Sequence, residues 1–275
     1  MPWEKELEVA LQATEAAGRL VMEHYDRLEA VPDAPSDIST EADRAAQELI
    51  LRHILDAFPA DRLCAEEKTP TLEKSRSTSS RLWIVDPIDG TRGFARKNGE
   101  FTVMVGFVNS GKMMAGVVLE PAIWRGTFAT KEGGCWRYSG MGGERKRCQV
   151  GKAIQLSEAG LTQSRSKTAR ESPVVKIMHP ARILETYSAG LKLAQVASGE
   201  ADIYVNIYPE FHDWDICAGH ILVEEAGGRV TTLAGEPIIY GSEGFKQRAG
   251  MLASNGALHE AAVQALKEMK TRQKT

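Results

Sequence analysis

The spacing of apolar residues changes once along the first half of this chain, and that change limits the folds open to it. From residue 3 to 28, and again from about 40 to 58, apolar side chains recur every three or four positions, as in amphipathic helices. Between residues 82 and 130 the apolar runs become short and rich in β-branched and aromatic residues, as in strands. Two long helices followed by a strand-rich region predict helices packed on a sheet.

The remaining elements follow from the same patterns. We predict strands at 82–85, 101–108, 113–119 and 124–130, with a hairpin turn at Asn109-Ser110-Gly111, and further strands near 174–178, 202–207, 229–232 and 250–253. Helices are predicted near 181–198, 215–226 and 256–270. Because helices and strands alternate without a regular βαβ order, we expect a layered α+β fold. A glycine-rich basic loop at 140–147 is expected to divide the chain into two halves, 1–145 and 146–275.

Charge and composition argue against a nucleic-acid partner and against a membrane span. The net charge is -3, so the short basic cluster Arg145-Lys146-Arg147 predicts a solvated loop and no nucleic-acid site. No apolar run approaches the ~18 residues of a membrane span, and the acidic N-terminal helix does not resemble a secretory signal. The cysteines, expected to be reduced thiols of a cytoplasmic protein, are Cys64, Cys135, Cys148 and Cys217.

The stretch "WIVDPIDGTRGF" places two aspartates, Asp86 and Asp89, directly after an apolar strand. Pro87 cannot donate a ladder hydrogen bond, so the strand is expected to end there. Residues i and i+3 of a straight strand face opposite sides, but at a strand-to-helix turn they can converge with the carbonyl of Ile88. These hard oxygen ligands suit Mg²⁺ or Mn²⁺, and free N–H groups at Gly90-Thr91 would favour a phosphate. A simple turn, bent by Asp-Gly, explains the stretch equally well.

Three other acidic positions have ordinary structural readings when each is taken alone. The pair Glu66-Glu67 ends a short apolar segment and is typical of a solvated surface. Thr40 and Asp43 fit a capping box at a helix start. Asp215 lies at the start of another helix, where aspartate commonly caps the N-terminus.

Taken together, these motifs resemble the lithium-sensitive, magnesium-dependent phosphomonoesterases of the inositol monophosphatase superfamily. The resemblance rests on "AEE" at 65–67, "WIVDPIDGTRGF" at 83–94 and "WDICAGHILVEEAGG" at 214–228, which occur in the order and at about the spacing of that family. It spans most of the chain, from Asp43 to the final helix. The family implies a layered α-β-α-β-α fold with the active site between two halves, and many of its members are homodimers.

The resemblance also implies a role for each acidic residue. Two or three Mg²⁺ ions, or Mn²⁺ in their place, would bind Glu66, Asp86, the carbonyl of Ile88, Asp89 and Asp215. Asp43 and Thr91 would orient the attacking water, with Glu66 as a further candidate base. The substrate would contact Ile88, Asp89, Gly90, Thr91, Lys192 and Asp215. His212 and His220 are expected to be structural.

The leaving group is less well determined. The basic loop after the motif, "QSRS" at 163–166 and "GLKLAQVASGEADIYVN" at 190–206 are similar to the bacterial 3'(2'),5'-bisphosphate nucleotidases, in which the equivalent of Lys192 contacts the nucleotide phosphate. Ala189-Gly190 departs from the serine pair of that branch and is nearer to some inositol monophosphatases. The sequence therefore favours 3'-phosphoadenosine 5'-phosphate as substrate, with inositol 1-phosphate or another sugar phosphate as the alternative. A non-catalytic binder of metal and phosphate is the rival of another class.

Overall fold

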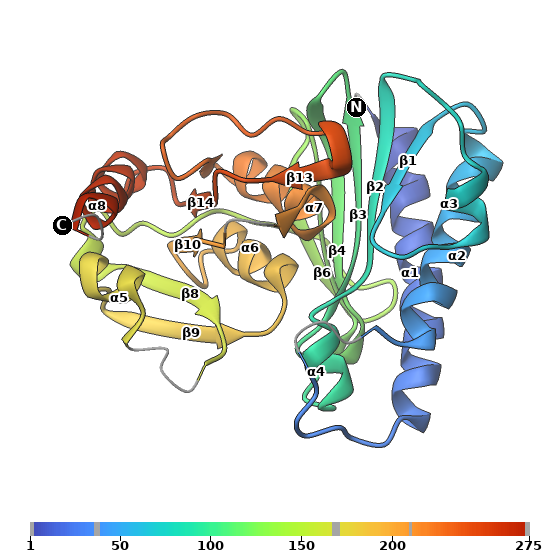
Figure 1. Ribbon diagram of the computed structural model, residues 1–275, viewed down its shortest axis with the longest axis horizontal. Coiled ribbons are helices and arrows are strands. Elements are labelled where there is room, and N and C mark those ends of the chain that lie inside the picture. The colour runs from blue at the N-terminus through green and yellow to red at the C-terminus, as the bar shows by residue number, and fades with distance from the viewer. Residues whose placement is uncertain (1–2, 36–38, 167–170, 209–210, 273–275) are drawn as a thin grey trace.

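Helices and sheets stack in five layers in the computed structural model, which describes residues 3–35, 39–166, 171–208 and 211–272 (Figure 1). The outer layers are helical, the second and fourth are sheets, and two further helices lie between the sheets. In order, the helices are α1 (Glu4–Arg27) and α2 (Glu41–Ala57), then α6 (Ala189–Ala197) and α7 (Asp213–Glu225), then α5 (Pro173–Met178) and α8 (His259–Arg272). This arrangement confirms the predicted α+β, α-β-α-β-α architecture.

The larger sheet has seven strands in sequence order. Its strands are β1 (Arg62–Ala65), β2 (Arg81–Asp89), β3 (Thr102–Asn109), β4 (Lys112–Glu120), β5 (Arg125–Thr130), β6 (Gly134–Ser139) and β7 (Lys146–Arg147). Only β1 and β2 pair in parallel; the other neighbours are antiparallel. The predicted hairpin is confirmed: Ser110 and Gly111, both with positive φ, connect β3 to β4. The expected division at residue 145 stays a prediction.

Both faces of this sheet are covered, which explains why β2 reads as an unbroken apolar run. Trp83 and Val85 point into the cluster formed with α1 and α2, whereas Leu82 and Ile84 point into the cluster formed with α7. This alternation follows from the two-residue period of a strand. Since both faces are buried, the sheet holds the C-terminal end of β2 in a fixed position between the layers.

The smaller sheet has five strands, in the order β12-β14-β10-β8-β9. These are β8 (Gly160–Ser164), β9 (Arg182–Thr186), β10 (Ile203–Asn206), β12 (Arg229–Thr231) and β14 (Met251–Ser254), and β11 (Phe211–His212) pairs separately with β13 (Lys246–Gln247). Two predictions here are wrong. Residues 174–178 form helix α5, because Ser172 caps Val175 and Pro173 occupies the first turn. The helix expected from 181 begins at Ala189, since 182–186 form the edge strand β9.

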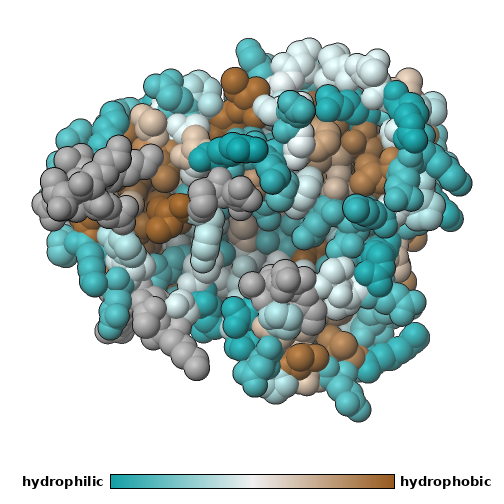
Figure 2. All heavy atoms as spheres, in the orientation of Figure 1, coloured by the Kyte–Doolittle hydropathy of each residue, from teal (hydrophilic) through white to brown (hydrophobic). Residues whose placement is uncertain are grey.

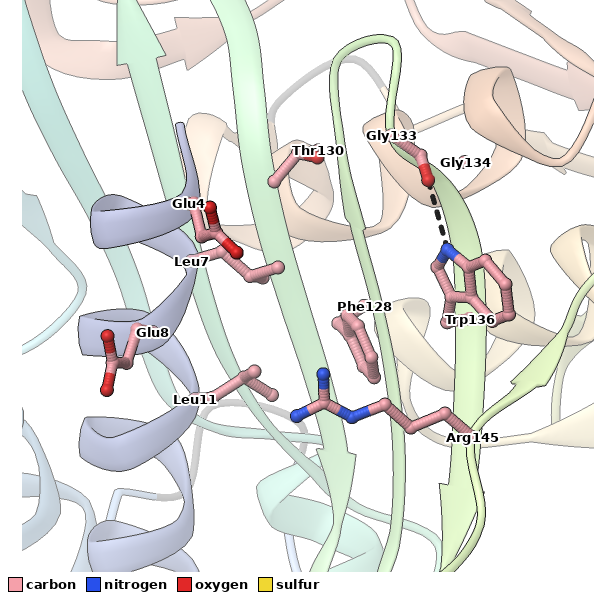
Figure 3. Close-up of a pocket in the computed structure, with 10 residues that line it drawn as sticks. All are labelled: Glu4, Leu7, Glu8, Leu11, Phe128, Thr130, Gly133, Gly134, Trp136 and Arg145. Carbon is pink, nitrogen blue, oxygen red and sulfur yellow. Dashed lines mark hydrogen bonds between the residues drawn. The ribbon is translucent and has the colours of Figure 1, made fainter. Parts of the chain in front are cut away.

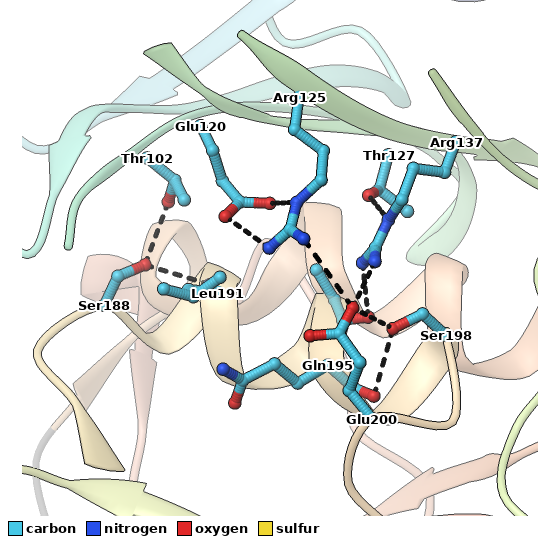
Figure 4. A network of polar contacts seen from close by, with 11 residues as sticks. Thr102, Glu120, Arg125, Thr127, Arg137, Ser188, Leu191, Gln195, Ser198 and Glu200 are labelled. Carbon is cyan, nitrogen blue, oxygen red and sulfur yellow. Dashed lines mark hydrogen bonds and ion pairs between the residues drawn. The ribbon is translucent and has the colours of Figure 1, made fainter. Parts of the chain in front are cut away.

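A network of arginines joins the larger sheet to α6 and to the loop after it (Figure 4). Arg137 of β6 contacts Glu200 and donates to the carbonyl of Ala194 at 3.0 Å. Arg125 of β5 lies 3.8 Å from Glu200 and makes a two-pronged ion pair with Glu120. These contacts fix α6 against the larger sheet, and Figure 1 shows α6 beside α7 between the two sheets.

Figure 2 shows that hydrophilic side chains cover most of one face and that apolar side chains form separate patches on it. Among the described helices, none is long and apolar enough to cross a bilayer.

Candidate active site

The C-terminal end of β2 carries an irregularity that brings its two aspartates to one side. Strand β2 does not end at Pro87, as the sequence had suggested, but continues to Asp89. Its pairing with β3 shifts register between Asp86, opposite Met104, and Asp89, opposite Thr102. Pro87 lies in this shift, where no ladder hydrogen bond is required of it. The bulge replaces the predicted strand-to-helix turn as the cause of convergence.

Gly90 makes the sharp turn from β2 into the short helix α4 (Thr91–Ala95). Its backbone is left-handed, with φ of 86°, and an added Cβ would lie 2.8 Å from the carbonyl oxygen of Glu100. Both observations restrict this position to glycine. The turn leaves Thr91 and the carbonyl of Ile88 close together, with 2.9 Å between the threonine hydroxyl and that oxygen.

Asp43 lies behind Thr91 and has two sets of partners. Its Oδ2 accepts from the backbone N–H of Thr40 at 2.8 Å, so the predicted capping box is present. Its Oδ1 lies 3.3 Å from the hydroxyl of Thr91. Burial raises the pKa of Asp43 to about 6. One carboxyl group therefore both caps α2 and contacts Thr91.

Glu66 reaches the same place from the neighbouring strand. Strands β1 and β2 are parallel, and Ala65 pairs with Val85, so the next residues of each strand emerge at the same edge. Glu66 as a whole residue is exposed to solvent, but protein atoms surround its carboxyl group. Loss of water around that group, followed by the charges of Asp215 and Asp43, raises its pKa to about 8.

Asp215 comes from the first turn of α7. It is not the cap itself: His212 is the N-cap residue, and Asp215 Oδ2 accepts its backbone N–H at 2.5 Å. Burial raises the pKa of Asp215 to about 7. His212 stacks on Trp214, and His220 lies 2.7 Å from the hydroxyl of Tyr240, as structural residues do.

Glu66, Thr91, Asp215 and the two aspartates of β2 line one pocket of about 280 Å³, whereas Asp43 is not among its lining residues. Its walls contain seven of the predicted residues and several others: Glu66, Asp86, Ile88, Asp89, Gly90, Thr91, Arg92, Ser164, Arg165, Tyr187, Tyr208 and Asp215. A hollow of about 390 Å³ between α1 and strands β5 and β6 has Leu11, Phe128 and Trp136 in its wall, and its lining includes none of the predicted site residues (Figure 3). Most of the predicted site residues therefore gather in the smaller pocket.

Asp86 is buried with part of its hydrogen-bonding capacity unused. It is 2% exposed, and its Oδ1 atom is buried without any hydrogen-bond partner among the described residues. Burial and the charges of Glu66 and Asp89 hold its pKa well above the usual range. A buried, unpartnered carboxylate oxygen in a group of carboxylates fits a divalent cation, which would supply the missing partner and offset the repulsion.

The carboxylates do not form a closed cage. Within the described ranges, no three histidine, cysteine or acidic side chains are close enough together to make a ready metal site. Asp89 Oδ2 accepts from Ser188 Oγ and, at 2.6 Å, from the N–H of Gly190. The donor set therefore matches a hard cation in chemistry, and side-chain rotation would have to close the coordination shell.

The sequence did not predict the surroundings of Lys192 and Ser188. Lys192 is 1% exposed, lies over the ring of Tyr204 and does not line the pocket, so its expected substrate contact stays a prediction. Ser188 was not predicted, yet it binds Asp89 and caps α6 through Leu191. Its position just before a helical pattern was the available signal. The pocket residues Arg92, Tyr187 and Tyr208 had no such signal.

Comparison with known proteins agrees with this fold. The family model described as the inositol monophosphatase family matches residues 3–271. The chain is 33% identical over 266 residues to the fructose-1,6-bisphosphatase/inositol-1-monophosphatase of Thermotoga maritima, covering 96% of each protein. It is 32% identical over 242 residues to the 3'(2'),5'-bisphosphate nucleotidase CysQ of Escherichia coli K12, covering 85% of this chain and 93% of the relative.

A solved structure supports the same assignment. The Thermotoga maritima IMPase TM1415 superposes with a TM-score of 0.80 at 29% identity, over 98% of this chain and 99% of that one. The chain thus has the layered fold of these phosphatases and an acidic pocket. The chain belongs to the inositol monophosphatase family, whose matched members are phosphatases.

Proposed function

We propose that this chain is a Mg²⁺-dependent phosphomonoesterase that hydrolyses 3'-phosphoadenosine 5'-phosphate to AMP and phosphate. The observation that carries the proposal is the buried, unpartnered Oδ1 of Asp86 beside the Gly90-Thr91 turn. Glu66, Asp86, the carbonyl of Ile88, Asp89 and Asp215 would hold two or three divalent cations, Mg²⁺ or Mn²⁺. Such ions polarise the phosphoryl group and lower the pKa of bound water.

The protein's own groups supply the remaining steps. The hydroxyl of Thr91, which lies within hydrogen-bond distance of Asp43 Oδ1 and of the carbonyl of Ile88, would orient a water toward phosphorus. Asp43, or Glu66 at the pocket wall, takes the proton from that water. The backbone N–H groups of Gly90 and Thr91 bind the phosphate oxygens. Because water attacks directly, no phosphoenzyme forms.

The substrate and setting belong to the same proposal. The nucleotide is favoured because "QSRS" at 163–166 and the region around Lys192 are similar to the nucleotidase branch, and Ser164 and Arg165 line the pocket. We also propose inhibition by Li⁺, a cytoplasmic location and, by analogy with the family, a homodimer.

Inositol 1-phosphate, or another sugar phosphate, is the second candidate because of Gly190. A Cβ atom at this position would lie 2.3 Å from Met104 Sδ and 2.9 Å from Thr102 Oγ1, so the serine of the nucleotidase branch cannot be accommodated without rearrangement. The Thermotoga relative, named for sugar-phosphate activities, matches over more of the chain than the nucleotidase does.

A substrate panel tests the proposal. Phosphate release is measured from 3'-phosphoadenosine 5'-phosphate, inositol 1-phosphate and fructose 1,6-bisphosphate with Mg²⁺, with EDTA and with Li⁺. We expect the nucleotide to be hydrolysed fastest, with loss of activity in EDTA and in Asp89→Asn. Faster release from a sugar phosphate would move the chain to the alternative. No release from any ester, with Mg²⁺ still bound, would support the non-catalytic binder.

A further inference from the structure

Three arginines surround one tyrosine at the mouth of the pocket. The guanidinium carbons of Arg92, Arg96 and Arg165 lie 5.6, 5.6 and 5.8 Å from the ring centre of Tyr187. Arg96 also donates to the hydroxyl of Tyr187 at 2.7 Å. Arg92 and Arg96 come from α4 and its C-terminal end, whereas Arg165 follows β8, so segments far apart in the sequence build this arginine collar together.

The positive charge of the collar is only partly neutralised. Arg165 makes a two-pronged ion pair with Glu100, one contact being 3.1 Å. Among the described residues, Glu100 is the one carboxylate paired with any of the three guanidinium groups. The Nε atoms of Arg92 and Arg96 are buried without hydrogen-bond partners there. Buried donors without acceptors are costly, so an anionic acceptor at this position would be stabilising.

Two of the three arginines lie on the boundary between two hollows, and Arg96 adjoins it through its hydrogen bond to Tyr187, which lines the catalytic pocket. Arg92 and Arg165 line the catalytic pocket and also an adjoining hollow of about 630 Å³. The adjoining hollow includes the apolar side chains of Leu161, Val174 and Val205. An ester whose phosphate sits at Gly90-Thr91 would therefore extend its leaving group past the arginines and onto an apolar surface.

We propose that Arg96 and Arg165, held by Tyr187, form a subsite for a second phosphate carried by the leaving group of the substrate. Guanidinium groups bind phosphate oxygens in pairs, which gives both affinity and orientation. A monophosphate ester would leave the collar empty. The inference rests on the proposed function, since it assigns a specificity subsite to that same pocket.

The test compares two substrates that differ only in the second phosphate. kcat/KM is measured with Mg²⁺ for 3'-phosphoadenosine 5'-phosphate and for adenosine 3'-phosphate, in the wild type, Arg96→Gln and Arg165→Gln. We expect the wild type to prefer the bisphosphate, and each variant to lose about tenfold more kcat/KM on the bisphosphate than on the monophosphate. If only sugar esters are turned over, fructose 1,6-bisphosphate and fructose 1-phosphate replace the nucleotide pair.

Lys97→Gln is the matched control. Lys97 adjoins Arg96 in the chain but lies over the ring of Tyr25 of α1, so the variant removes the same charge without touching the collar. It should leave both substrates unaffected. Equal kcat/KM for the two substrates in the wild type, or an equal loss on both in the arginine variants, would overturn the subsite alone. No phosphate release from any ester would instead overturn the proposed function, and the subsite with it.

Discussion

At the scale of single residues, Asp86 and Asp61 show how the same side chain is used in opposite ways. Both aspartates are buried and lie on or beside neighbouring strands. Asp61 accepts hydrogen bonds at 2.8 Å from both Arg81 and Trp83, so its charge is satisfied. Asp86 leaves one oxygen unpartnered. A satisfied carboxylate stabilises the fold, whereas an unsatisfied one costs stability that is consistent with a binding role.

Asp86→Asn and Asp61→Asn should therefore change the free energy of unfolding in opposite directions. We expect Asp86→Asn to stabilise the metal-free protein by about 1 kcal/mol, because it removes a charge that burial disfavours, while phosphatase activity falls at least ~100-fold. Asp61→Asn should destabilise it by about 1–3 kcal/mol with activity retained. Urea unfolding of both variants in EDTA checks this, and destabilisation by Asp86→Asn would contradict the reading of Asp86.

At the scale of elements, the β2–α4 turn depends on glycine for two separable reasons. Gly90 and Gly99 both have left-handed backbones, with φ of 86° and 77°. An added Cβ at Gly99 would meet only Ala122 Cβ, at 3.4 Å, whereas at Gly90 it would lie 2.8 Å from a backbone oxygen. Comparing substitutions at Gly90 and Gly99 therefore separates the cost of a left-handed backbone from the cost of a steric clash.

Gly99→Ala should cost about 1–2 kcal/mol, the price of a left-handed alanine. Gly90→Ala should cost clearly more and should abolish activity, since the backbone of Glu100 must move and the turn holds Thr91. Thermal unfolding and phosphate release report the two effects. Equal destabilisation by the two variants would show that the close approach at Gly90 is unimportant.

His259, at the start of α8, makes the docking of that helix sensitive to acid. Its ring nitrogens lie 2.9 Å from Thr231 Oγ1 and 2.8 Å from Ser254 Oγ. Burial lowers the pKa of His259 from 6.5 to about 4. A lowered pKa gives stability that is present above pH 6.5 and lost as the pH falls toward 4.

We expect the free energy of unfolding to fall by up to ~3 kcal/mol between pH 6.5 and 4 because of this group. In His259→Gln the fall over that range should be smaller, although the variant starts less stable. Urea midpoints at pH 7 and pH 5 provide the comparison. An unchanged pH dependence in the variant would exclude His259 as the cause.

Several elements could be predicted from sequence because local pattern and tertiary environment agree in them. The long amphipathic helices and the strands of the large sheet belong to this group. The prediction failed around 174–186, where short apolar runs fit either period. There the deciding contacts were Ser172 and Pro173 at a helix start, and the edge pairing of β9 with β8. Likewise, the register shift that turns Asp86 and Asp89 to one side depends on pairing with β3, which spacing alone does not reveal.

At the scale of the whole molecule, we expect the acidic pocket to make stability depend on pH and on metal together. The pKa of Glu66 is raised to about 8 and that of Asp215 to about 7, from usual values near 4. A raised pKa gives stability that is complete below the unfolded value and is lost as the pH rises through the folded one. The metal-free protein should therefore lose stability between about pH 4 and pH 8.

Added Mg²⁺ should reverse this loss, and more strongly at pH 8 than at pH 5, because protonated carboxylates must first release their protons to bind a cation. The increase in Tm between EDTA and Mg²⁺, measured at both values, tests the expectation. An increase that is larger at pH 5 would contradict the proposed role of these carboxylates.

The most direct test of the central claim compares two adjacent glutamates. Metal-stripped wild type, Glu66→Gln and Glu67→Gln are titrated with Mg²⁺ while phosphate release from 3'-phosphoadenosine 5'-phosphate and inositol 1-phosphate is followed. Glu67 accepts a hydrogen bond from Ser39 at 2.6 Å and is not among the residues lining the pocket. The account predicts that Mg²⁺ restores activity to the wild type and to Glu67→Gln but not to Glu66→Gln. Activity without added metal, or full recovery of Glu66→Gln, would contradict it.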